Sequence, residues 1–495
     1  MAALDDLLGR LNPDPYRRGK QFERICKWFL THDPVYAREL HRVWLWDEWP
    51  GRWGADAGID LVAEDHHGHL WAIQAKAYDE ATWITKRDVD TFLAEAGRSV
   101  FSFRLLIATT NLIGRTAKRT IEAQEKPASV LLLGDLDTAE VDWPRSPSEL
   151  RARRLPPKRP RRHQRQAINA VVKGFERAHR GQMIMACGTG KTLAALFITE
   201  KLAAERTLVL VPSLSLLSQT LREWTANTKL GFDFLPVCSD ETVAEPDAVV
   251  ANTSDLGYPV TTDPEEIATF LRRRSGPRVV FSTYQSSPQI ATAFRLGRVP
   301  SFDLVIADEA HRCAGRVSSD FATILNSEAV KAHRRLFMTA TPRYFTGRVL
   351  REAAEADFEV ASMDNQAVFG PVFHKLGFAE AIDRDLLTDY QVVVVGVDNA
   401  EYRDWAQRGR FVTLDGTKVT DARALAGQIG LAKAMRRYDL RRTITFHSRV
   451  KRAREFAHSL PEVIAWMPTR QRPKGHLWSD YASGEMPAGQ RHVLL

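Results

Sequence analysis

The chain has 495 residues, which at roughly 100–200 residues per domain predicts about three domains. Hydrophobic residues make up 44% and charged residues 26% of the sequence, which is ordinary for a soluble globular protein, so cores of normal size can form. The formal net charge of +8 and the sequence pI of about 9.3 point to a polyanionic partner. A merely solvated basic surface is the alternative, and composition alone slightly favours it.

Cysteine usage and the apolar runs exclude two further classes of protein. The chain has no CxxC pair, so we expect neither a disulfide framework nor a zinc site; its four cysteines are Cys26, Cys187, Cys238 and Cys313. The first six residues are acidic where a signal peptide would be basic, and no apolar run reaches the ~18 residues needed to span a membrane. We therefore expect a cytoplasmic protein that does not engage a membrane.

The first predicted element with chemical content is a β-hairpin in the N-terminal module. Its two strands and the turn between them are predicted at residues 58–63, 70–76 and 64–69 respectively. Gln74 and Lys76 are two residues apart on one strand, so they share a face. A hairpin centred near His67 places Asp60 opposite residue 75 or so. The strand period and the turn position together predict that Asp60, Gln74 and Lys76 converge.

These three side chains suit phosphodiester hydrolysis, which needs a metal ion and a base or charge stabiliser near the attacked phosphorus. Asp60 and the amide oxygen of Gln74 can hold Mg²⁺, and Lys76 can orient the hydroxide or stabilise developing negative charge. The arrangement resembles the PD-(D/E)XK nucleases, in the Mrr-like restriction branch whose second acid is replaced by glutamine. That resemblance implies a catalytic role for Glu23, on the predicted helix 21–30. The alternative is a polar strand face with an ion pair between Asp60 and Lys76.

A basic, proline-rich segment follows this module. Residues 144–160 contain five prolines, and residues 145–165 contain nine basic residues against one acid, Glu149. Proline prevents regular structure and like charges repel, so the pattern predicts a linker. Two interpretations of its arginines stay open, a solvated linker and a surface that rests on DNA phosphates.

Downstream of the linker, short apolar runs alternate with helical patterns. The first set of runs lies at residues 183–186, 207–211, 279–281, 304–306 and 336–338. Helical patterns at 193–204 and 214–224 lie between them. Near-continuous apolar strands that alternate with helices predict a parallel sheet covered on both faces. A second set of runs predicts strands of a second such sheet, at residues 391–395, 443–446, 463–466 and 492–495.

A glycine-rich loop separates the first strand of this set from the helix that follows. Its predicted nucleotide-binding residues are Gly188, Thr189, Gly190, Lys191 and Thr192. Glycines let such a loop curl so that backbone N–H groups face phosphate oxygens at a helix N-terminus. Lys191 can reach the β- and γ-phosphates, and the Thr192 hydroxyl can coordinate Mg²⁺. The loop departs from the GxxxxGK[ST] pattern at its first position, Met185, which leaves the phosphate cradle intact.

Two more motifs stand at predicted strand ends. Asp308-Glu309-Ala310-His311 follows the strand 303–307, and the carboxyl end of a buried parallel strand emerges at the ligand-binding edge of its sheet. There Asp308 can hold Mg²⁺, and Glu309 can orient or deprotonate the attacking water. A further strand ends in Thr339-Ala-Thr-Pro342. Three strand-end motifs in this order are much more specific than any one alone.

These residues resemble the superfamily 2 helicases and translocases, over roughly Arg161 to Leu495. The resemblance implies that Gln164 contacts the adenine base. Four other segments resemble family motifs that touch the tracking DNA strand, couple hydrolysis to domain movement or open the second RecA-like domain: Val211-Pro-Ser213, Ser282-Thr283, Thr339-Ala-Thr341 and Thr445-Phe-His-Ser448. The implied cofactors are ATP and Mg²⁺.

The order of nuclease, basic linker and motor resembles the N-terminal part of the single-polypeptide Type I (Type ISP) restriction–modification enzymes. The likeness extends to the stretch from Ala367 to Gln391, which links the two motor domains in that family. We expect an α/β protein with a restriction-endonuclease-like domain and two RecA-like domains, the second truncated. The expected divisions are a nuclease domain at 1–143, a linker at 144–160, and RecA-like domains at 161–387 and 388–495. The implied function is an ATP-dependent DNA motor coupled to a Mg²⁺-dependent endonuclease that restricts foreign double-stranded DNA.

The end of the sequence suggests a piece of a longer enzyme. The chain has no methyltransferase motif, and it stops at His492–Leu495, where the resembled motors continue into two more motifs and an arginine finger. We expect poor ATPase activity from this fragment, with methyltransferase and target-recognition modules in the missing C-terminal part or a partner chain. Two other classes stay open, a restriction subunit of a multi-subunit Type I system and a non-cleaving DNA repair helicase. Mg²⁺-dependent nicking by residues 1–144 would exclude the latter.

Overall fold

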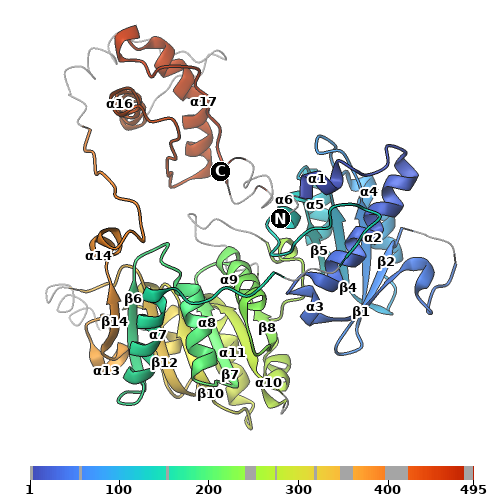
Figure 1. Cartoon of the computed structure of the whole chain (residues 1–495), viewed down its shortest axis with the longest axis horizontal. Helices are drawn as coiled ribbons and strands as arrows, with labels where there is room; N and C mark the ends of the chain where they lie inside the picture. Colours follow the sequence, from blue (N-terminus) through green and yellow to red (C-terminus); the bar gives the residue numbers. More distant parts are fainter. Residues whose placement is uncertain are drawn as a thin grey trace. The chain divides into compact units, whose positions relative to one another are not determined.

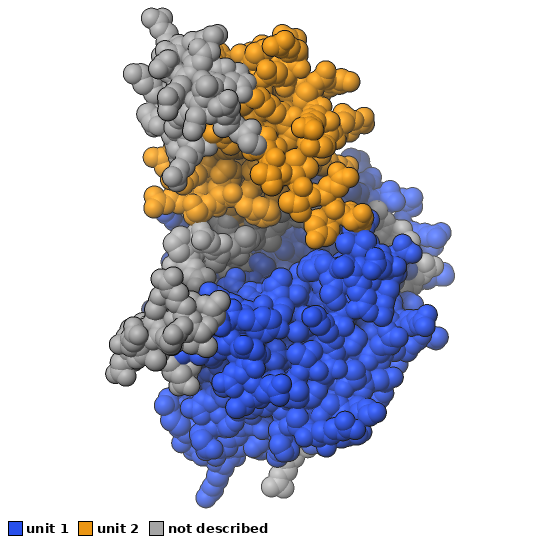
Figure 2. All heavy atoms as spheres, turned by 90° about the vertical axis from the view of Figure 1, so that its left-hand side faces the viewer, with its two compact units in different colours: residues 1–244, 249–388, 487–490 blue, residues 245–248, 389–486, 491–495 orange. Residues whose placement is uncertain are grey.

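The computed structural model describes most of the chain in two compact units (Figure 2). The described residues are 4–54, 58–151, 155–239, 252–273, 276–316, 320–345, 360–395, 422–483, 486 and 494. The first unit comprises nearly all residues up to 388, and the second is formed chiefly by residues 389–486.

The N-terminal part of the first unit is built on a five-stranded mixed sheet (Figure 1). Its strands in spatial order are β1 (Leu40–Leu45), β2 (Leu61–Asp65), β3 (Leu70–Lys76), β4 (Phe101–Ala108) and β5 (Ala128–Leu131). The first three pair antiparallel, and β3, β4 and β5 pair parallel. Its helices are α1 (Leu4–Leu8), α2 (Pro15–His32), α3 (Tyr36–Glu39), α4 (Lys86–Glu95), α5 (Arg115–Glu122) and α6 (Leu133–Asp137).

Alternation along the strands gives this sheet two apolar faces. Trp71 and Ile73 of β3 point to the face that α2 covers with Phe22 and Ile25. The intervening residue Ala72 points to the other face, which α4 and α5 cover. A strand whose successive side chains are buried on opposite sides must lie inside a three-layer structure.

The predicted β2–β3 hairpin is present, with the turn centred where the sequence placed it. Leu61 lies opposite Ile73 and Val62 opposite Ala72. Asp60 directly precedes β2, and its N–H donates to the carbonyl of Ile73 at 2.9 Å, so the pairing continues one residue beyond the strand. This register brings Asp60 opposite Gln74.

The second part of the first unit is a seven-stranded sheet in which every pairing is parallel. In spatial order its strands are β14 (Val372–Leu376), β6 (Arg180–Met185), β12 (Ala332–Thr339), β10 (Phe302–Ala307), β7 (Arg206–Val211), β9 (Arg278–Thr283) and β8 (Asp233–Val237). The five predicted strands of the first set are therefore confirmed, whereas β8 and β14 had no counterpart in the sequence prediction.

Helices cover both faces of this sheet (Figure 1). One apolar cluster joins it to α7 (Arg162–Gly174), α8 (Lys191–Lys201) and α9 (Leu214–Asn227). A second cluster on the opposite face joins it to α10 (Pro264–Arg272) and α11 (Ser287–Arg295). The shorter elements of this part are η3 (Thr253–Asp255), η4 (Tyr284–Ser286), η5 (Ala310–Arg312), β11 (Gly315–Arg316), η6 (Asp320–Leu325), β13 (Val360–Ala361), α13 (Gln366–Phe369) and α14 (Phe378–Asp383). The fold is the doubly covered parallel sheet of a RecA-like domain.

The second unit contains helices α16 (Ala422–Tyr438) and α17 (Val450–Trp466) and the turn η7 (Thr469–Gln471). They share a small apolar core that includes Ile429 and Val463. The predicted strand at 463–466 is wrong, because these residues form the last turn of α17. Leu460, Val463 and Ile464 recur at helical spacing, and that pattern buries them against α16.

The other predicted strands of the second sheet are not found among the described residues. Residues 391–395 and 443–446 carry no strand, and Val394 and Phe446 are 91% and 94% exposed. Of residues 492–495, only Leu494 is described. Among the described helices, none is both long and apolar enough to cross a membrane.

Candidate active sites

The glycine-rich loop, which is predicted to bind phosphate, joins β6 to α8 as a tight turn. Gly188 and Gly190 have φ of 79° and 80°, in the left-handed region that glycine enters without steric cost. Helix α8 begins at Lys191 directly after Gly190, and Thr192 lies in its first turn. The hydroxyl of Thr189 donates to the carbonyl of Ala186 at 2.6 Å, which closes the turn. The helix N-terminus therefore presents its free N–H groups to the loop.

Two neighbouring side chains of α7 contact the backbone carbonyls of this loop. The Nε2 atom of His163 lies 2.8 Å from the carbonyl oxygen of Thr189, and Gln164 donates from Nε2 to the carbonyl of Gly190 at 3.1 Å. Gln164 also accepts the N–H of Arg161 at 2.8 Å. Gln164 thus fixes the shape of the phosphate loop here, and its contact with adenine stays a prediction.

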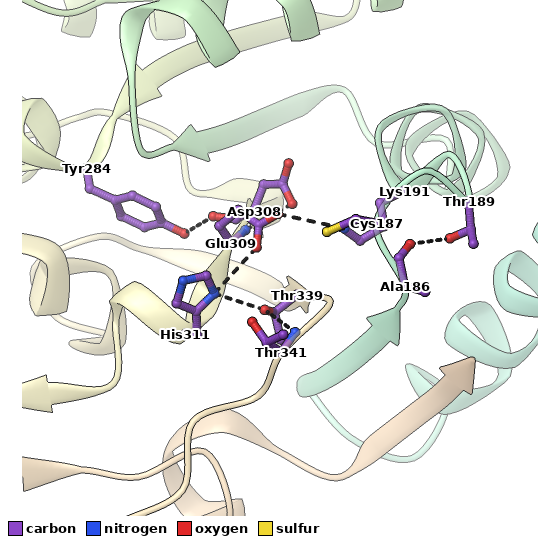
Figure 3. Close-up of polar contacts among 10 residues, drawn as sticks. All are labelled: Ala186, Cys187, Thr189, Lys191, Tyr284, Asp308, Glu309, His311, Thr339 and Thr341. Atoms are coloured by element: carbon purple, nitrogen blue, oxygen red, sulfur yellow. Dashed lines mark hydrogen bonds and ion pairs between the residues drawn. The ribbon is translucent and has the colours of Figure 1, made fainter. Parts of the chain in front are cut away.

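The carboxylates of the Asp308-Glu309 pair lie across the site from Lys191 (Figure 3). The Nζ atom of Lys191 is 3.7 Å from Oε1 of Glu309. Burial, then the neighbouring charge of Glu309, raises the pKa of Asp308 to about 6. The pKa of Glu309 is lowered, first by its contact with His311 and also by Lys191. Glu309 therefore remains charged at neutral pH, as a group that orients water must.

The backbone of Glu309 is itself unusual. Its φ and ψ are 49° and 45°, a left-handed conformation that non-glycine residues rarely adopt. The N–H of Glu309 donates to Oδ1 of Asp308 at 2.9 Å, and Tyr284 donates its hydroxyl to the carbonyl of Asp308 at 2.6 Å. These bonds support a strained conformation that turns the Glu309 side chain into the site.

His311 connects this box to the end of β12 (Figure 3). Its Nδ1 atom lies 3.0 Å from the hydroxyl of Thr339 and 3.4 Å from Oε2 of Glu309. The same Thr339 hydroxyl accepts the N–H of Thr341 at 3.1 Å. A polar chain therefore runs from the Glu309 carboxylate to the motif that the resemblance assigns to domain coupling.

Strand order explains why three motifs that are far apart in sequence meet. The phosphate loop follows β6, the Thr339 motif ends β12, and the Asp308 box follows β10, and these three strands are neighbours in the sheet. Since all are parallel, their carboxyl ends lie at one edge. The structure thus brings together Lys191, Asp308 and Glu309 as the sequence predicted.

The two segments predicted to touch DNA lie at the carboxyl ends of the next strands, β7 and β9. Ser213 caps α9 by accepting the N–H of Leu216 at 3.3 Å. The side chains of Ser282 and Thr283 are buried, and Thr283 donates to the hydroxyl of Ser286 at 3.1 Å. These hydroxyl groups support the local fold, so their proposed contact with DNA stays a prediction.

The hairpin site in the N-terminal sheet brings Asp60 and Gln74 together. Oδ2 of Asp60 accepts the N–H of Ala75 at 2.8 Å, and Gln74 donates from Nε2 to the carbonyl of Gly58 at 3.0 Å. These bonds leave Oε1 of Gln74 buried and without a hydrogen-bond partner. Lys76 ends the same strand and is partly exposed.

Glu23 belongs to this neighbourhood. It is buried on α2, and its carboxylate pairs with Lys20 at 3.0 Å. Burial, then the charges of Asp60 and Glu23, raises the pKa of the Cys26 thiol, so both carboxylates act on one buried group of α2. The placement of Glu23 beside Asp60 and its catalytic role both stay predictions.

The residues present fit a divalent metal ion at the hairpin site in one specific way. Within the described ranges, no cluster of three or more His, Cys, Asp and Glu side chains could hold a metal. A metal at this site would therefore rest on Asp60 and on oxygens outside that set. The orphaned Oε1 of Gln74 is such a ligand, because an unpaired buried oxygen costs free energy that a cation would recover.

Sequence reasoning missed several residues that shape the motor site. His163 and Tyr284 bond backbone carbonyls on either side of it, and Trp224 of α9 donates from Nε1 to the carbonyl of Thr192 at 3.0 Å. His163 and Tyr284 adjoin segments that the sequence singled out, Gln164 and Ser282-Thr283, whereas Trp224 had no such signal. Tyr284 and Trp224 lie far along the chain from the residues they support.

Comparisons with known proteins agree with this geometry. Residues 31–150 match a family described as "Restriction endonuclease", and residues 157–344 match one described as "Type III restriction enzyme, res subunit". The chain joins a restriction-endonuclease domain to a helicase domain. Its overall fold matches a solved structure described as an ATP-dependent Type ISP restriction–modification enzyme, LlaBIII, bound to DNA, with a TM-score of 0.79 and 30% identity. That match covers 100% of this chain and 33% of the other.

Two curated relatives match more than half of the chain. A probable helicase of African swine fever virus is 29% identical over 305 residues, which are 61% of this chain and 31% of the viral protein. The endonuclease subunit of the Type I restriction enzyme EcoAI from Escherichia coli is 26% identical over 269 residues, or 53% of this chain and 27% of that subunit. The chain thus spans between a quarter and a third of the length of these relatives.

Proposed function

We propose that this chain is an ATP-driven DNA translocase motor coupled to a Mg²⁺-dependent DNA endonuclease, and that it acts in the restriction of foreign double-stranded DNA. The observation that carries the proposal is that one chain contains two candidate active sites. One is at the edge of the parallel sheet, where Lys191 and Glu309 meet, and the other is at the hairpin, where Asp60 lies opposite Gln74. The match to a DNA-bound Type ISP enzyme supports DNA as the partner. An enzyme that meets entering DNA acts in the cytoplasm, where we place it.

At the motor site, each residue has a distinct task. The N–H groups of the 188–192 loop and the ammonium group of Lys191 bind the phosphates of ATP. Glu309 orients the attacking water, and His311 holds Glu309 in place while contacting Thr339. Mg²⁺ held by Thr192 and Asp308 would neutralise charge on the β- and γ-phosphates. Because His311 touches both the water-orienting carboxylate and the β12 motif, loss of the γ-phosphate can be relayed to the domain-coupling segment.

At the nuclease site, Asp60 and Oε1 of Gln74 are the proposed metal ligands. A bound Mg²⁺ would lower the pKa of a coordinated water and polarise the scissile phosphate. The bond from Ala75 to Asp60 and the bond from Gln74 to Gly58 fix both ligand oxygens in position. Lys76 supplies a cation beside the attacked phosphate, and Glu23 with Lys20 forms the helical side of the site.

Two arrangements of the whole enzyme are compatible with this function. The end-to-end match to the Type ISP structure favours a single polypeptide that also carries methyltransferase and target-recognition modules. The similarity to the EcoAI subunit favours the alternative, in which those modules lie in partner chains. The higher structural coverage leads us to propose the first. In a pull-down from the native host, recovery of the chain as part of one longer polypeptide supports it, and recovery with a separate methyltransferase subunit contradicts it.

The function is tested on the full chain with two readouts. We expect Mg-ATP to bind, and we expect nicking of plasmid DNA that requires Mg²⁺ and is removed by Asp60→Asn. Asp90→Asn is the matched control, because Asp90 lies in the same domain and pairs only with Lys86 at the surface. Nucleotide binding without nicking in the unsubstituted chain would support the non-cleaving helicase instead.

A further inference from the structure

Helix α9 contacts three functional regions of the first unit. Its N-terminus follows Pro212 and Ser213, in the segment predicted to touch DNA. In its C-terminal turn, Trp224 is fully buried and donates from Nε1 to the carbonyl of Thr192, in the first turn of the phosphate-binding helix. At its end, Oδ1 of Asn227 accepts the N–H of Lys158 at 2.8 Å. Lys158 belongs to the segment that connects the nuclease and helicase domains.

The connecting segment is thereby fixed at one point rather than free along its length. The Nζ atom of Lys158 pairs with Glu140 of the nuclease domain at 3.1 Å, while its backbone N–H is held by Asn227, which is 2% exposed. Lys158 therefore contacts both the end of α9 and the end of the nuclease domain. Proline-rich composition predicted a linker without regular structure, and its described residues have none, but composition gave no sign of this attachment.

The nuclease domain also docks directly on the helicase domain. Tyr36 donates its hydroxyl to the carbonyl of Gly257 at 2.9 Å, and both groups are buried. Lys118 of α5 pairs with Asp255 at 3.2 Å, with side chains only 15% and 6% exposed. A single apolar cluster runs from the α2 face of the nuclease sheet to the α7–α9 face of the helicase sheet.

Arg222 places a buried charge at this junction, on the same helix. Burial opposes its charge, but the nearby Tyr36 and Asp33 of the nuclease domain outweigh that effect and raise its pKa. Burial in turn raises the pKa of Asp33, and the positive charge of Arg222 partly offsets the rise. Asp33 also accepts the N–H groups of Val35 and Tyr36, so it anchors the start of α3.

We propose that α9 is the element that couples the nucleotide site to the nuclease domain, with Trp224 and Asn227 as positioning residues. Trp224 and Asn227 lie within one turn of each other, and a helix this short is stiff along its axis. A shift of the Thr192 carbonyl when phosphate is bound therefore displaces the whole C-terminal turn of α9. That turn carries the attachment to Lys158 and adjoins the docking surface at Tyr36. The inference rests on the proposed function, because it requires nucleotide to bind at the 188–192 loop.

The test compares amide hydrogen exchange in the nuclease domain with and without a non-hydrolysable ATP analogue and Mg²⁺, on the full chain. In the unsubstituted chain we expect the analogue to change exchange in residues 33–39 by about fivefold or more, the lower end of typical coupling between sites. Trp224→Phe keeps a buried aromatic ring but removes the indole N–H. At analogue concentrations that saturate the variant, most of the exchange response should be abolished. A helix that is merely structural would change stability without removing this response.

The matched control is Thr225→Ala on the same helix, because the hydroxyl of Thr225 bonds only to carbonyls within α9. It should respond to the analogue as the unsubstituted chain does. If Trp224→Phe does not fold, Asn227→Ala, which releases Lys158, is judged by the same criterion. An unsubstituted chain that binds the analogue with no change at residues 33–39, or a Trp224→Phe chain with the full response, overturns the coupling role. Failure of the unsubstituted chain to bind the analogue contradicts the proposed function itself.

Discussion

The hydroxyl of Tyr36 donates a hydrogen bond to the carbonyl of Gly257, 221 residues further along the chain. The bond joins the start of α3 in the nuclease domain to the segment after η3 in the helicase domain. Gly257 has φ of 80°, and a Cβ atom there would lie 2.5 Å from the Tyr36 hydroxyl and 2.6 Å from Leu131. The two domains approach so closely at this point that only glycine fits.

A substitution at this position should therefore weaken the docking. Gly257→Ala adds a methyl group into a filled space, and overpacking of this kind costs about 1–3 kcal/mol. Gly276→Ala is the matched control, since Gly276 has φ of 76° but nothing within 4 Å of its Cβ position. Both variants carry the same backbone strain, so the difference in their denaturant midpoints measures the clash. Equal destabilisation of the two would show that the domains do not meet at Gly257.

Docking should also depend on pH through Glu39. Burial, then the charges of Asp65 and Asp233, raises the pKa of Glu39 to about 8, with Glu266 adding to the rise and Arg273 opposing it. A carboxyl whose folded-state pKa is raised contributes stability that is full below its ordinary pKa of 4.5 and is lost as the pH rises through about 8. Exchange at residues 33–39 should accelerate over that range. Glu39→Gln should flatten the pH profile of this exchange. If the variant leaves the profile unchanged, another group causes the pH dependence.

At the motor site, Lys191→Ala should weaken Mg-ATP binding about 10–100-fold, as expected for loss of charge-assisted hydrogen bonds. Lys201→Ala, at the other end of α8, removes the same charge from the same helix and pairs only with Asn169. It should leave affinity unchanged. Titration of a fluorescent nucleotide into both variants makes the comparison, and equal affinities would remove Lys191 from the phosphate site.

Binding of Mg-ATP should weaken at acid pH. Since the pKa of Asp308 is raised to about 6, this carboxyl is mostly protonated at pH 5 and cannot serve a metal ion there. Affinity for Mg-nucleotide should fall as the pH drops through about 6, whereas affinity for nucleotide in EDTA should change much less. Asp308→Asn should bind Mg-nucleotide weakly at every pH. A decline of the same size in EDTA would point to another titrating group.

At the nuclease site, the orphaned oxygen of Gln74 leads us to predict different outcomes for two substitutions. Gln74→Leu removes that oxygen and should abolish Mg²⁺-dependent nicking, while Gln74→Glu keeps an oxygen ligand and should retain nicking at a changed Mg²⁺ requirement. ATP binding should be unchanged in both, because the two sites belong to separate sheets. Nicking by Gln74→Leu at the unsubstituted rate would exclude Gln74 as a ligand.

Much of the site geometry could be predicted from sequence because it follows from strand period and direction. The turn at His67 determines which residues oppose each other, and so places Asp60 against Gln74. Parallel strands bring Lys191 and Glu309 to one edge even though more than a hundred residues separate them. In both cases a local rule is sufficient, since hydrogen bonding of the backbone propagates the register.

The remainder depends on contacts that no local rule encodes. The strand at 463–466 was predicted from its short apolar run, whereas α17 continues through Pro461 and buries Val463 and Ile464 against α16. Strand β8 contains Pro236 and lies at the sheet edge, where a missing N–H is tolerated, so its pattern was weak. Tyr36 bonds to Gly257 and Trp224 bonds to Thr192, and each of these hydrogen bonds joins segments that are distant in the sequence. The hydrophobic periodicity of the sequence cannot predict such bonds.

The attachment of Lys158 to Asn227 has a kinetic consequence. Because the nuclease and helicase domains are also joined covalently through residues 144–160, separation of their docked surfaces would leave each at an effective concentration in the millimolar range relative to the other. Recapture would then be an intramolecular event that is independent of protein concentration. The docked surfaces would therefore re-form after a separation even where a single contact between them is weak.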